Sequence, residues 1–178
     1  KNKLDIIFVF EPSPITVGIP AIFVKKIKKI PLCFWVLDLW PESVVSAGNL
    51  EKTSFIPKLL DPIVKFIYKH SDKILVSSNG FIDSVESKGI SREKIEFFPQ
   101  WAEPLFKPIK SRDYLLGDIP KDSFKIMFAG NIGEAQDFSS ILEAAKELKG
   151  EQDINWVILG GGRREKWVKS KIEEYGLE

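Results

Sequence analysis

The feature that most constrains the fold is a recurring rhythm of short apolar runs separated by segments with helical spacing. The runs DIIFVF (residues 5–10) and LCFWVL (residues 32–37) are rich in β-branched and aromatic residues and short enough to be strands. Between them, residues 17–27 have the apolar spacing of a helix, which Pro31 stops. Neither run alternates with polar residues, so we expect parallel strands covered on both faces. The start of the chain therefore predicts a β-α-β unit.

The same rhythm continues, breaks at a proline-rich stretch (PQWAEPLFKP), and then restarts. In the first block we expect a helix over 56–70 with Pro62 as a possible kink, a strand in DKILVSS (72–78), a short helix over 81–88 closed by Gly89, and a strand over 94–98. In the second block we expect strands in FKIMFAG (124–130) and NWVILGGG (155–162), a helix over 141–148 and a final helix from about Arg164.

The restart predicts two α/β domains, over residues 1–106 and 123–178, joined by a linker over 107–122. Two strands are too few for a stable parallel sheet, because each of them remains an edge. We therefore expect the chain to be a central piece of a longer protein.

The composition argues against several classes of function. The 26 basic and 25 acidic residues nearly balance, which argues against nucleic-acid binding. Cys33 is the only cysteine, which fits a reducing cytosol, and His70, at a predicted helix end, is the only histidine. A zinc site lacks its usual ligands, and a Cys/His nucleophile pair would require Cys33 and His70, which are far apart in the sequence, to meet in space by chance. No apolar run is long enough to span a bilayer, so we expect a cytoplasmic protein.

Two predicted strands end in glycine turns, FAGNIG and LGGGRR. Glycine lets the backbone approach a ligand closely, and the start of the following helix offers N–H groups to a phosphate. The candidate residues are Gly130, Ile132, Gly133, Gly160 and Gly161. Purely structural turns are the alternative, because neither turn matches a nucleotide-binding fingerprint.

The stretch PLCFWVLDLWPES ends an apolar run abruptly in Asp38, Trp40 and Glu42. In an open α/β sheet, ligands bind outside the carboxyl ends of the strands. Trp101 and Glu103 follow another strand at the same end of the predicted sheet, so we expect these five residues to line one cleft. A capped turn is the alternative.

The segment KKIKK (Lys25–Lys29) carries four lysines at the end of a predicted amphipathic helix. A solvated helix end is the simpler interpretation, and contact with anionic lipid headgroups is the alternative.

Five segments together resemble the family 4 (group 1) glycosyltransferases, in particular the bacterial capsule, O-antigen and exopolysaccharide branch. They are SPITVGIPAI, WVLDLWPES, DKILVSSNGFIDSV, IEFFPQWAE and FAGNIGEAQDFSSILEAA, and they run over nearly the whole chain. The resemblance implies two partial Rossmann-like parallel-sheet domains of a GT-B enzyme, with the acceptor on the N-terminal side and a nucleotide sugar, UDP- or GDP-linked, mostly on the C-terminal side. It further implies retention of anomeric configuration, with no metal and no cofactor.

The sequence departs from this family's pattern at the donor diphosphate. The family has an arginine where this chain has Asn131 and a lysine where it has Gln136. Amides carry no charge, so the resemblance implies that the diphosphate relies on the 130–133 backbone and the helix dipole, with Arg163 supplying positive charge.

On the acceptor side, Leu37 and Asp38 lie where many family members have a catalytic histidine. Asp38 is thus the catalytic candidate, and the matched acceptor-side motifs add Ser13 to the predicted cleft. The family's donor-binding glutamate pair is expected beyond Glu178 and its first glycine loop before Lys1, so we expect this piece alone to be inactive.

The resulting prediction is a section of a retaining glycosyltransferase of cell-surface polysaccharide biosynthesis, acting on a lipid-linked or saccharide acceptor, cytoplasmic or peripheral to the inner membrane surface. Two alternatives stay open. One is a non-enzymatic α/β binding or scaffold protein, and the other is a GT-B-like sugar-nucleotide epimerase.

Overall fold

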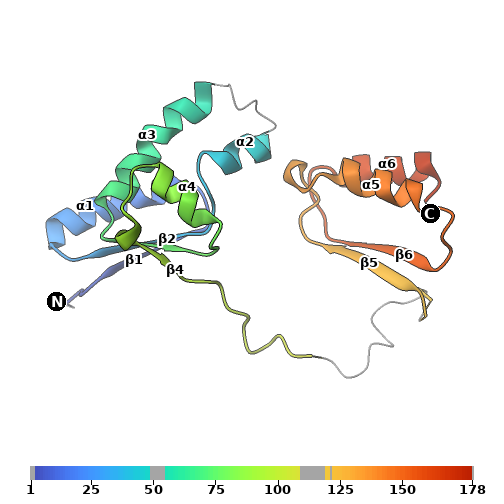
Figure 1. The fold of residues 1–178 in the computed structure, drawn as a ribbon, viewed down its shortest axis with the longest axis horizontal. Helices are drawn as coiled ribbons and strands as arrows, with labels where there is room; N and C mark the ends of the chain where they lie inside the picture. Colours follow the sequence, from blue (N-terminus) through green and yellow to red (C-terminus); the bar gives the residue numbers. More distant parts are fainter. Residues whose placement is uncertain (1–2, 49–54, 109–118, 121, 178) are drawn as a thin grey trace. The chain divides into compact units, whose positions relative to one another are not determined.

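The computed structural model describes residues 3–48, 55–108, 119–120 and 122–177 (Figure 1). The chain divides into two compact units, with the boundary between Glu103 and Pro104. Most of the predicted linker, residues 107–122, lies outside the described residues.

The first unit contains a four-stranded parallel sheet whose strands follow one another in chain order. The strands are β1 (Ile7–Glu11), β2 (Leu32–Val36), β3 (Lys73–Val76) and β4 (Ile95–Phe97). The connections contain η1 (Ile15–Val17), α1 (Gly18–Lys28), α2 (Glu42–Gly48), α3 (Phe55–His70), α4 (Phe81–Ser87) and η2 (Arg92–Lys94). Each predicted strand and helix is present, α3 runs through Pro62, and α2 is an element that the sequence did not predict.

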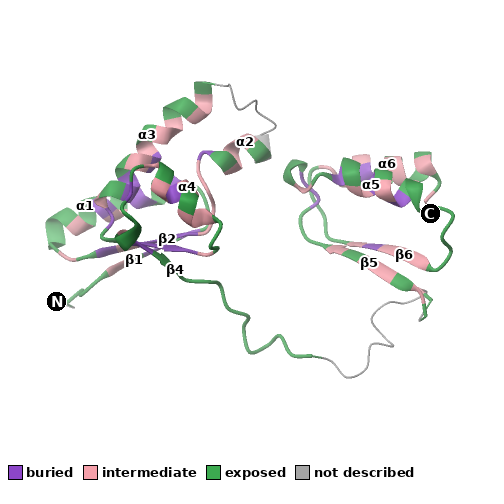
Figure 2. Ribbon diagram, in the orientation of Figure 1, coloured by how far each residue is buried: buried purple, intermediate pink, exposed green. Residues whose placement is uncertain are grey.

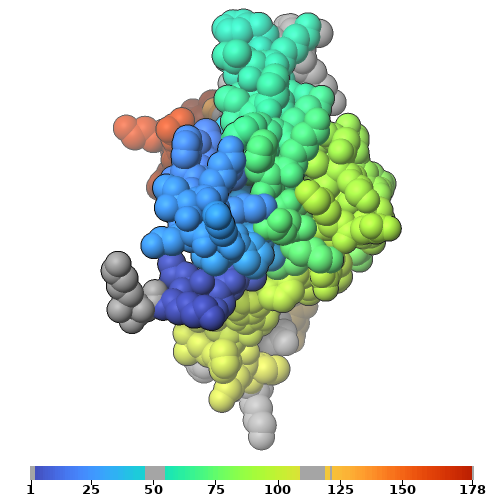
Figure 3. All heavy atoms as spheres, turned by 90° about the vertical axis from the view of Figure 1, so that its left-hand side faces the viewer, coloured from blue at the N-terminus to red at the C-terminus, as the bar shows by residue number. Residues whose placement is uncertain are grey.

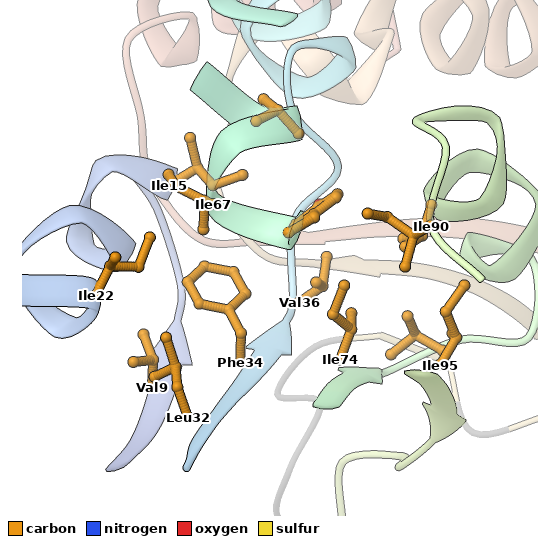
Figure 4. Packing of buried hydrophobic residues seen from close by; sticks show 14 residues of the cluster. Val9, Ile15, Ile22, Leu32, Phe34, Val36, Ile67, Ile74, Ile90 and Ile95 are labelled. Atoms are coloured by element: carbon orange, nitrogen blue, oxygen red, sulfur yellow. The ribbon is translucent and has the colours of Figure 1, made fainter. Parts of the chain in front are cut away.

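The helices α1, α3 and α4 lie on one face of this sheet (Figure 1). Parallel strands in consecutive order, joined by right-handed crossovers, place every connecting helix on the same side. The core lies between these layers, where Val9, Phe34 and Ile74 point from the strands toward Ile22 and Ile67 of the helices (Figure 4).

The opposite face of the sheet is not covered by helices within the described part of the chain. Phe8 and Phe10 are 50% and 52% exposed there, whereas Val9 between them is buried. On the same face Trp35 and Leu75 are buried, at 3% and 9% exposed, so the inner strands β2 and β3 are covered on both faces, whereas the edge strand β1 is covered on one face within the described residues. The apolar runs lack alternation because both faces of the sheet are apolar.

Close packing of α1 on its neighbours depends on Gly18. A Cβ atom at this position would lie 2.5 Å from a methyl group of Ile67 on α3 and 2.9 Å from the ring of Phe34 on β2. Glycine thus lets α1 approach both elements, and Figure 3 shows α1 and α3 side by side over the first unit.

The second unit is a pair of parallel strands with two helices. It contains β5 (Phe124–Ala129), η3 (Glu134–Gln136), α5 (Phe138–Glu147), β6 (Ile154–Leu159) and α6 (Glu165–Tyr175). Its core is small and is formed by Ile132, Phe138, Leu142 and Val168. Figure 2 shows every residue of β5 as intermediate or exposed. Two partial parallel sheets with helices confirm the predicted α/β fold class.

Candidate functional site

The two glycine turns of the second unit interlock directly. The Gly130 N–H donates to the Leu159 carbonyl and the Ile132 N–H donates to the Gly161 carbonyl, each at 2.9 Å. A Cβ atom on Gly160 would lie 1.9 Å from the Gly130 carbonyl oxygen, and Gly160 also has φ +137°. The turns are thus brought together as predicted, and contact between the two backbones is itself a reason for glycine at residue 160.

Three backbone amides of the first turn are already engaged. Besides Gly130 and Ile132, Gly133 donates its N–H to the Asn131 carbonyl at 3.1 Å. An anion at this turn would therefore depend on side chains or on the second turn more than on these three amides.

Two predicted side-chain amides do come together here. A Cβ atom on Gly133 would lie 2.7 Å from Asn131 Nδ2 and 2.9 Å from Gln136 Oε1, so both amides flank this glycine. Gln136 Oε1 is buried and has no hydrogen-bond partner among the described residues. The pair offers neutral donors and acceptors of the kind that bind hydroxyl or phosphate oxygens.

The two arginines after the second turn differ in their partners. Arg164 forms a 2.9 Å ion pair with Glu134 and lies 3.7 Å above the ring of Trp167. Arg163 is exposed and forms no ion pair within the described part of the chain. Of these two cations, Arg163 is therefore the one with a charge to offer to a ligand.

The acceptor-side candidate Asp38 lies two residues after the end of β2 and is half-buried. Burial raises the pKa of its carboxyl group, and the nearby Ser43 partly offsets this rise. The Asp38 N–H donates to Glu11 Oε2 at 3.4 Å. Asp38 is therefore positioned beside a second acidic side chain.

Sequence reasoning missed Glu11, which ends β1 and is fully buried. Burial raises the pKa of this carboxyl from 4.5 to about 7, although hydrogen bonds from the backbone of Asp38 and Leu37 oppose the rise. The signal was present in the sequence: an acidic residue ends the apolar run DIIFVFE in the same way that Asp38 follows the next run.

The structure does not bring Trp40 and Trp101 together. Trp40 packs partly buried against the core beneath the helices. Trp101 stacks on Trp35 with ring centroids 5.7 Å apart and an angle of 12°. Trp35 alternates with the core residue Phe34, so Trp101 lies on the opposite face of the sheet.

The remaining acceptor-side candidates are spread along the loops. Ser13 is exposed in the loop after β1, and Glu103 is exposed in the segment after β4. Glu42 begins α2 and pairs with Lys88 at 3.3 Å, and the same ammonium lies 3.0 Å from Asp61. Glu42 thus takes part in an ion-pair cluster that connects α2, α3 and the end of α4.

Three further observations concern metals, membranes and His70. No cluster of His, Cys, Asp and Glu that could hold a metal ion occurs within the described residues. None of the helices in the described ranges has the length and apolar character needed to cross a bilayer. His70 ends α3, as predicted from the sequence, and its Nδ1 lies 2.8 Å from the Phe66 carbonyl oxygen.

Comparison with known proteins gives consistent matches. Residues 117–178 match the family described as glycosyl transferases group 1. The probable glycosyltransferase WbjE of Pseudomonas aeruginosa is 32% identical over 150 residues, which is 81% of this chain and 36% of WbjE. The putative colanic acid biosynthesis glycosyl transferase WcaI of Escherichia coli (strain K12) is 30% identical over 111 residues, 60% of this chain and 27% of WcaI.

Among solved structures, Anabaena Alr3699/HepE in complex with UDP and glucose matches with a TM-score of 0.70 at 14% identity, covering 98% of this chain and 46% of that protein. At this identity the match shows a shared fold, the GT-B fold. The chain spans 36% and 27% of the length of the two curated relatives.

Proposed function

Because this chain belongs to the group 1 glycosyltransferase family, we propose that it is a section of an enzyme that transfers a sugar from a nucleotide donor to a lipid-linked or saccharide acceptor. The observation that carries the proposal is the family match over residues 117–178, which contain both glycine turns. The name of the relative WcaI, a putative colanic acid biosynthesis enzyme, supports a role in cell-surface polysaccharide synthesis.

On the donor side, we assign nucleotide-sugar binding to the interlocked turns. Asn131 and Gln136 flank Gly133 and supply hydrogen bonds, and Arg163 supplies a positive charge. Hydrogen bonds to charged groups are the stronger kind, so neutral amides can bind a diphosphate if an arginine contributes as well. We propose a UDP- or GDP-linked donor, transfer with retention, and no metal ion.

The donor assignment is tested by titrating UDP and GDP into the chain and following its amide resonances. Asn131→Ala and Arg163→Ala should each weaken binding about three- to tenfold, which is the loss of one hydrogen bond or ion pair. Gln152→Ala, an exposed amide in the loop before β6, is the matched control. If both site variants bind UDP and GDP as tightly as the wild type, the turns are not part of the donor site, and a purely structural role is favoured.

On the acceptor side, we propose that Asp38 orients the acceptor hydroxyl and accepts its proton as the hydroxyl oxygen bonds to the anomeric carbon of the donor sugar. The bond from that carbon to the diphosphate oxygen breaks, and the nucleoside diphosphate leaves with the electron pair. Its half-buried position at the carboxyl end of β2 supports this role. In the longer protein that contains this chain, Asp38→Ala should lower turnover by at least a hundredfold. Unchanged turnover would exclude Asp38 from the mechanism.

Product analysis of that longer protein separates the rival functions. A lengthened saccharide or lipid-linked acceptor supports transfer, and the anomeric proton coupling of the new linkage tests retention. Free sugar epimers would identify an epimerase instead. Absence of UDP and GDP binding, with no product of either kind, would leave a binding or scaffold protein.

We further propose peripheral contact of α1 with an anionic membrane surface. Phe23 and Ile27, four residues apart, are 63% and 75% exposed, and Lys26, Lys28 and Lys29 are exposed beside them. Lys25 is not included in this patch, because its ammonium is held by Asp72 at 2.7 Å.

Flotation with vesicles that contain phosphatidylglycerol tests this contact. A double substitution, Phe23→Ser with Ile27→Ser, should reduce the bound fraction severalfold. Phe55→Ser, at a 73% exposed aromatic residue outside the patch, should leave binding unchanged. Equal binding of both variants would refute the contact.

A further inference from the structure

Glu11 is a buried acid in an apolar layer. It ends β1 directly beside Val36 of β2 and lies on the same face as Val9, beneath the helices. It is fully buried. An acid at such a position is unfavourable unless its oxygens find partners, and an apolar residue would be the simpler choice for stability.

The two oxygens of Glu11 have different surroundings. Oε2 accepts the Asp38 N–H at 3.4 Å, and the backbone amide of Leu37 acts on the same carboxyl group. Oε1 is buried without a hydrogen-bond partner among the described residues. Oε2 therefore holds the backbone that follows β2, whereas Oε1 lacks a hydrogen-bond donor among the described residues.

Trp40 Nε1, Ser43 Oγ and Tyr68 Oη are also buried without a hydrogen-bond partner among the described residues. Of these three, the Ser43 side chain is close enough to Asp38 to lower the pKa of its carboxyl group. Burial chiefly, and then the charges of Glu11, Glu42 and Asp38, raise the pKa of Tyr68, which places its hydroxyl close to these carboxyl groups. Buried polar groups in native proteins are almost always paired, so a cluster of unpaired ones is typical of a functional region.

We propose that Glu11 is a positioning residue that fixes the backbone of Leu37 and Asp38, so that the Asp38 carboxyl group is held in place at the acceptor side. This inference rests on the proposed function of Asp38. The alternative is that Glu11 merely fills the end of β1 and does not control Asp38.

Amide hydrogen exchange of this chain tests the positioning directly. Glu11→Leu removes the oxygen that accepts the Asp38 N–H, and Glu11→Asp keeps a carboxyl group but shortens the side chain by one methylene group. Exchange at the Asp38 amide should accelerate about three- to tenfold in both variants, the equivalent of one hydrogen bond, and stay within about twofold of wild type in Glu11→Gln. Glu96→Gln, at an exposed glutamate of β4, is the control.

An unchanged Asp38 exchange rate in Glu11→Asp would overturn the proposal, even if Glu11→Leu fails to fold. This result does not depend on enzymatic activity, so it stands whether or not the longer protein transfers a sugar.

Kinetics of the longer protein give the second readout. Glu11→Asp should lower kcat about tenfold with little change in the KM for the donor, and Glu11→Gln should restore most of kcat. In an Asp38→Asn background the same Glu11→Asp substitution should change kcat less than twofold, because a positioning residue acts through its partner. Multiplicative losses would refute action through Asp38. Absence of transfer by the wild type would instead count against the proposed function.

Discussion

Replacement of Glu11 by glutamine should change how the stability of the first unit depends on pH. Burial raises the pKa of this carboxyl group from 4.5 to about 7. A raised pKa means that its contribution to stability is fully present below pH 4.5 and is lost as the pH rises through 7. At about 1.4 kcal/mol per pH unit, the wild type should lose about 3 kcal/mol relative to Glu11→Gln between pH 4.5 and 8.

The comparison measures the ionisation of Glu11 together with its coupling to the neighbouring groups. Asp38, whose pKa is also raised by burial, and Tyr68 are present in both proteins; the charge of Asp38 contributes to the pKa of Glu11, and the charge of Glu11 contributes to the pKa of Tyr68. Glutamine keeps an oxygen that can accept from the Asp38 amide but has no ionisable proton. The difference between the two proteins is therefore the measured quantity, and any offset that is constant with pH has no bearing on it.

Urea denaturation followed by tryptophan fluorescence provides the assay. Trp35, Trp40 and Trp101 lie in the first unit, and the signal of Trp156 and Trp167 in the second unit is common to both proteins. The difference in free energy of unfolding between wild type and Glu11→Gln is measured at several pH values from 4.5 to 8. Glu96→Gln should show no such slope, because this residue is exposed. A difference for Glu11→Gln that stays constant within about 0.5 kcal/mol would show that Glu11 is not raised to about 7 in the folded protein.

Three further predictions concern packing. Gly160→Ala should destabilise the second unit by about 2–4 kcal/mol, because its Cβ would lie 1.9 Å from a backbone oxygen, whereas Gly150→Ala, with nothing within 4 Å, should be neutral in thermal denaturation. Lys88→Met should lower the free energy of unfolding, measured by urea denaturation, by about 1–2 kcal/mol, since this ammonium lies between two carboxylates and its side chain is 11% exposed. Trp101→Ala should shift the fluorescence of Trp35 to longer wavelength and cost about 1 kcal/mol, because the stacked ring is lost.

The order and type of the main elements could be predicted from the sequence because strands and helices differ in length and spacing. The runs that end at Phe10 and Leu37 correspond to β1 and β2, with boundaries that differ by at most two residues. The covering of the sheet could not be predicted in the same way. An apolar residue type indicates that burial is favourable, but it does not show which element provides the cover. Phe8 and Phe10 are as apolar as buried residues, yet they lie on the face that no helix of the described residues covers.

The candidate site shows a similar division. The glycine turns could be placed side by side from the sequence, because adjacent parallel strands end at the same edge of a sheet. Their interlocking hydrogen bonds, which engage the amides of Gly130 and Ile132, depend on backbone geometry that no local pattern encodes. Gly160 stays a predicted donor-site residue, and the structure gives a separate reason for glycine there, which is the contact with the backbone of Gly130.

The acceptor side shows how the pleat of a single strand decides which residues can cooperate. In β2, Phe34 and Val36 face the helices whereas Trp35 faces away, so Trp101, which stacks on Trp35, is separated by the sheet from Trp40. Glu11 and Asp38, by contrast, lie at neighbouring strand ends and share a hydrogen bond. The proposed acceptor side is therefore better described as a pair of acidic residues than as an aromatic cleft. This pair could have been predicted from the sequence, had the residue that ends each apolar run been compared across adjacent strands.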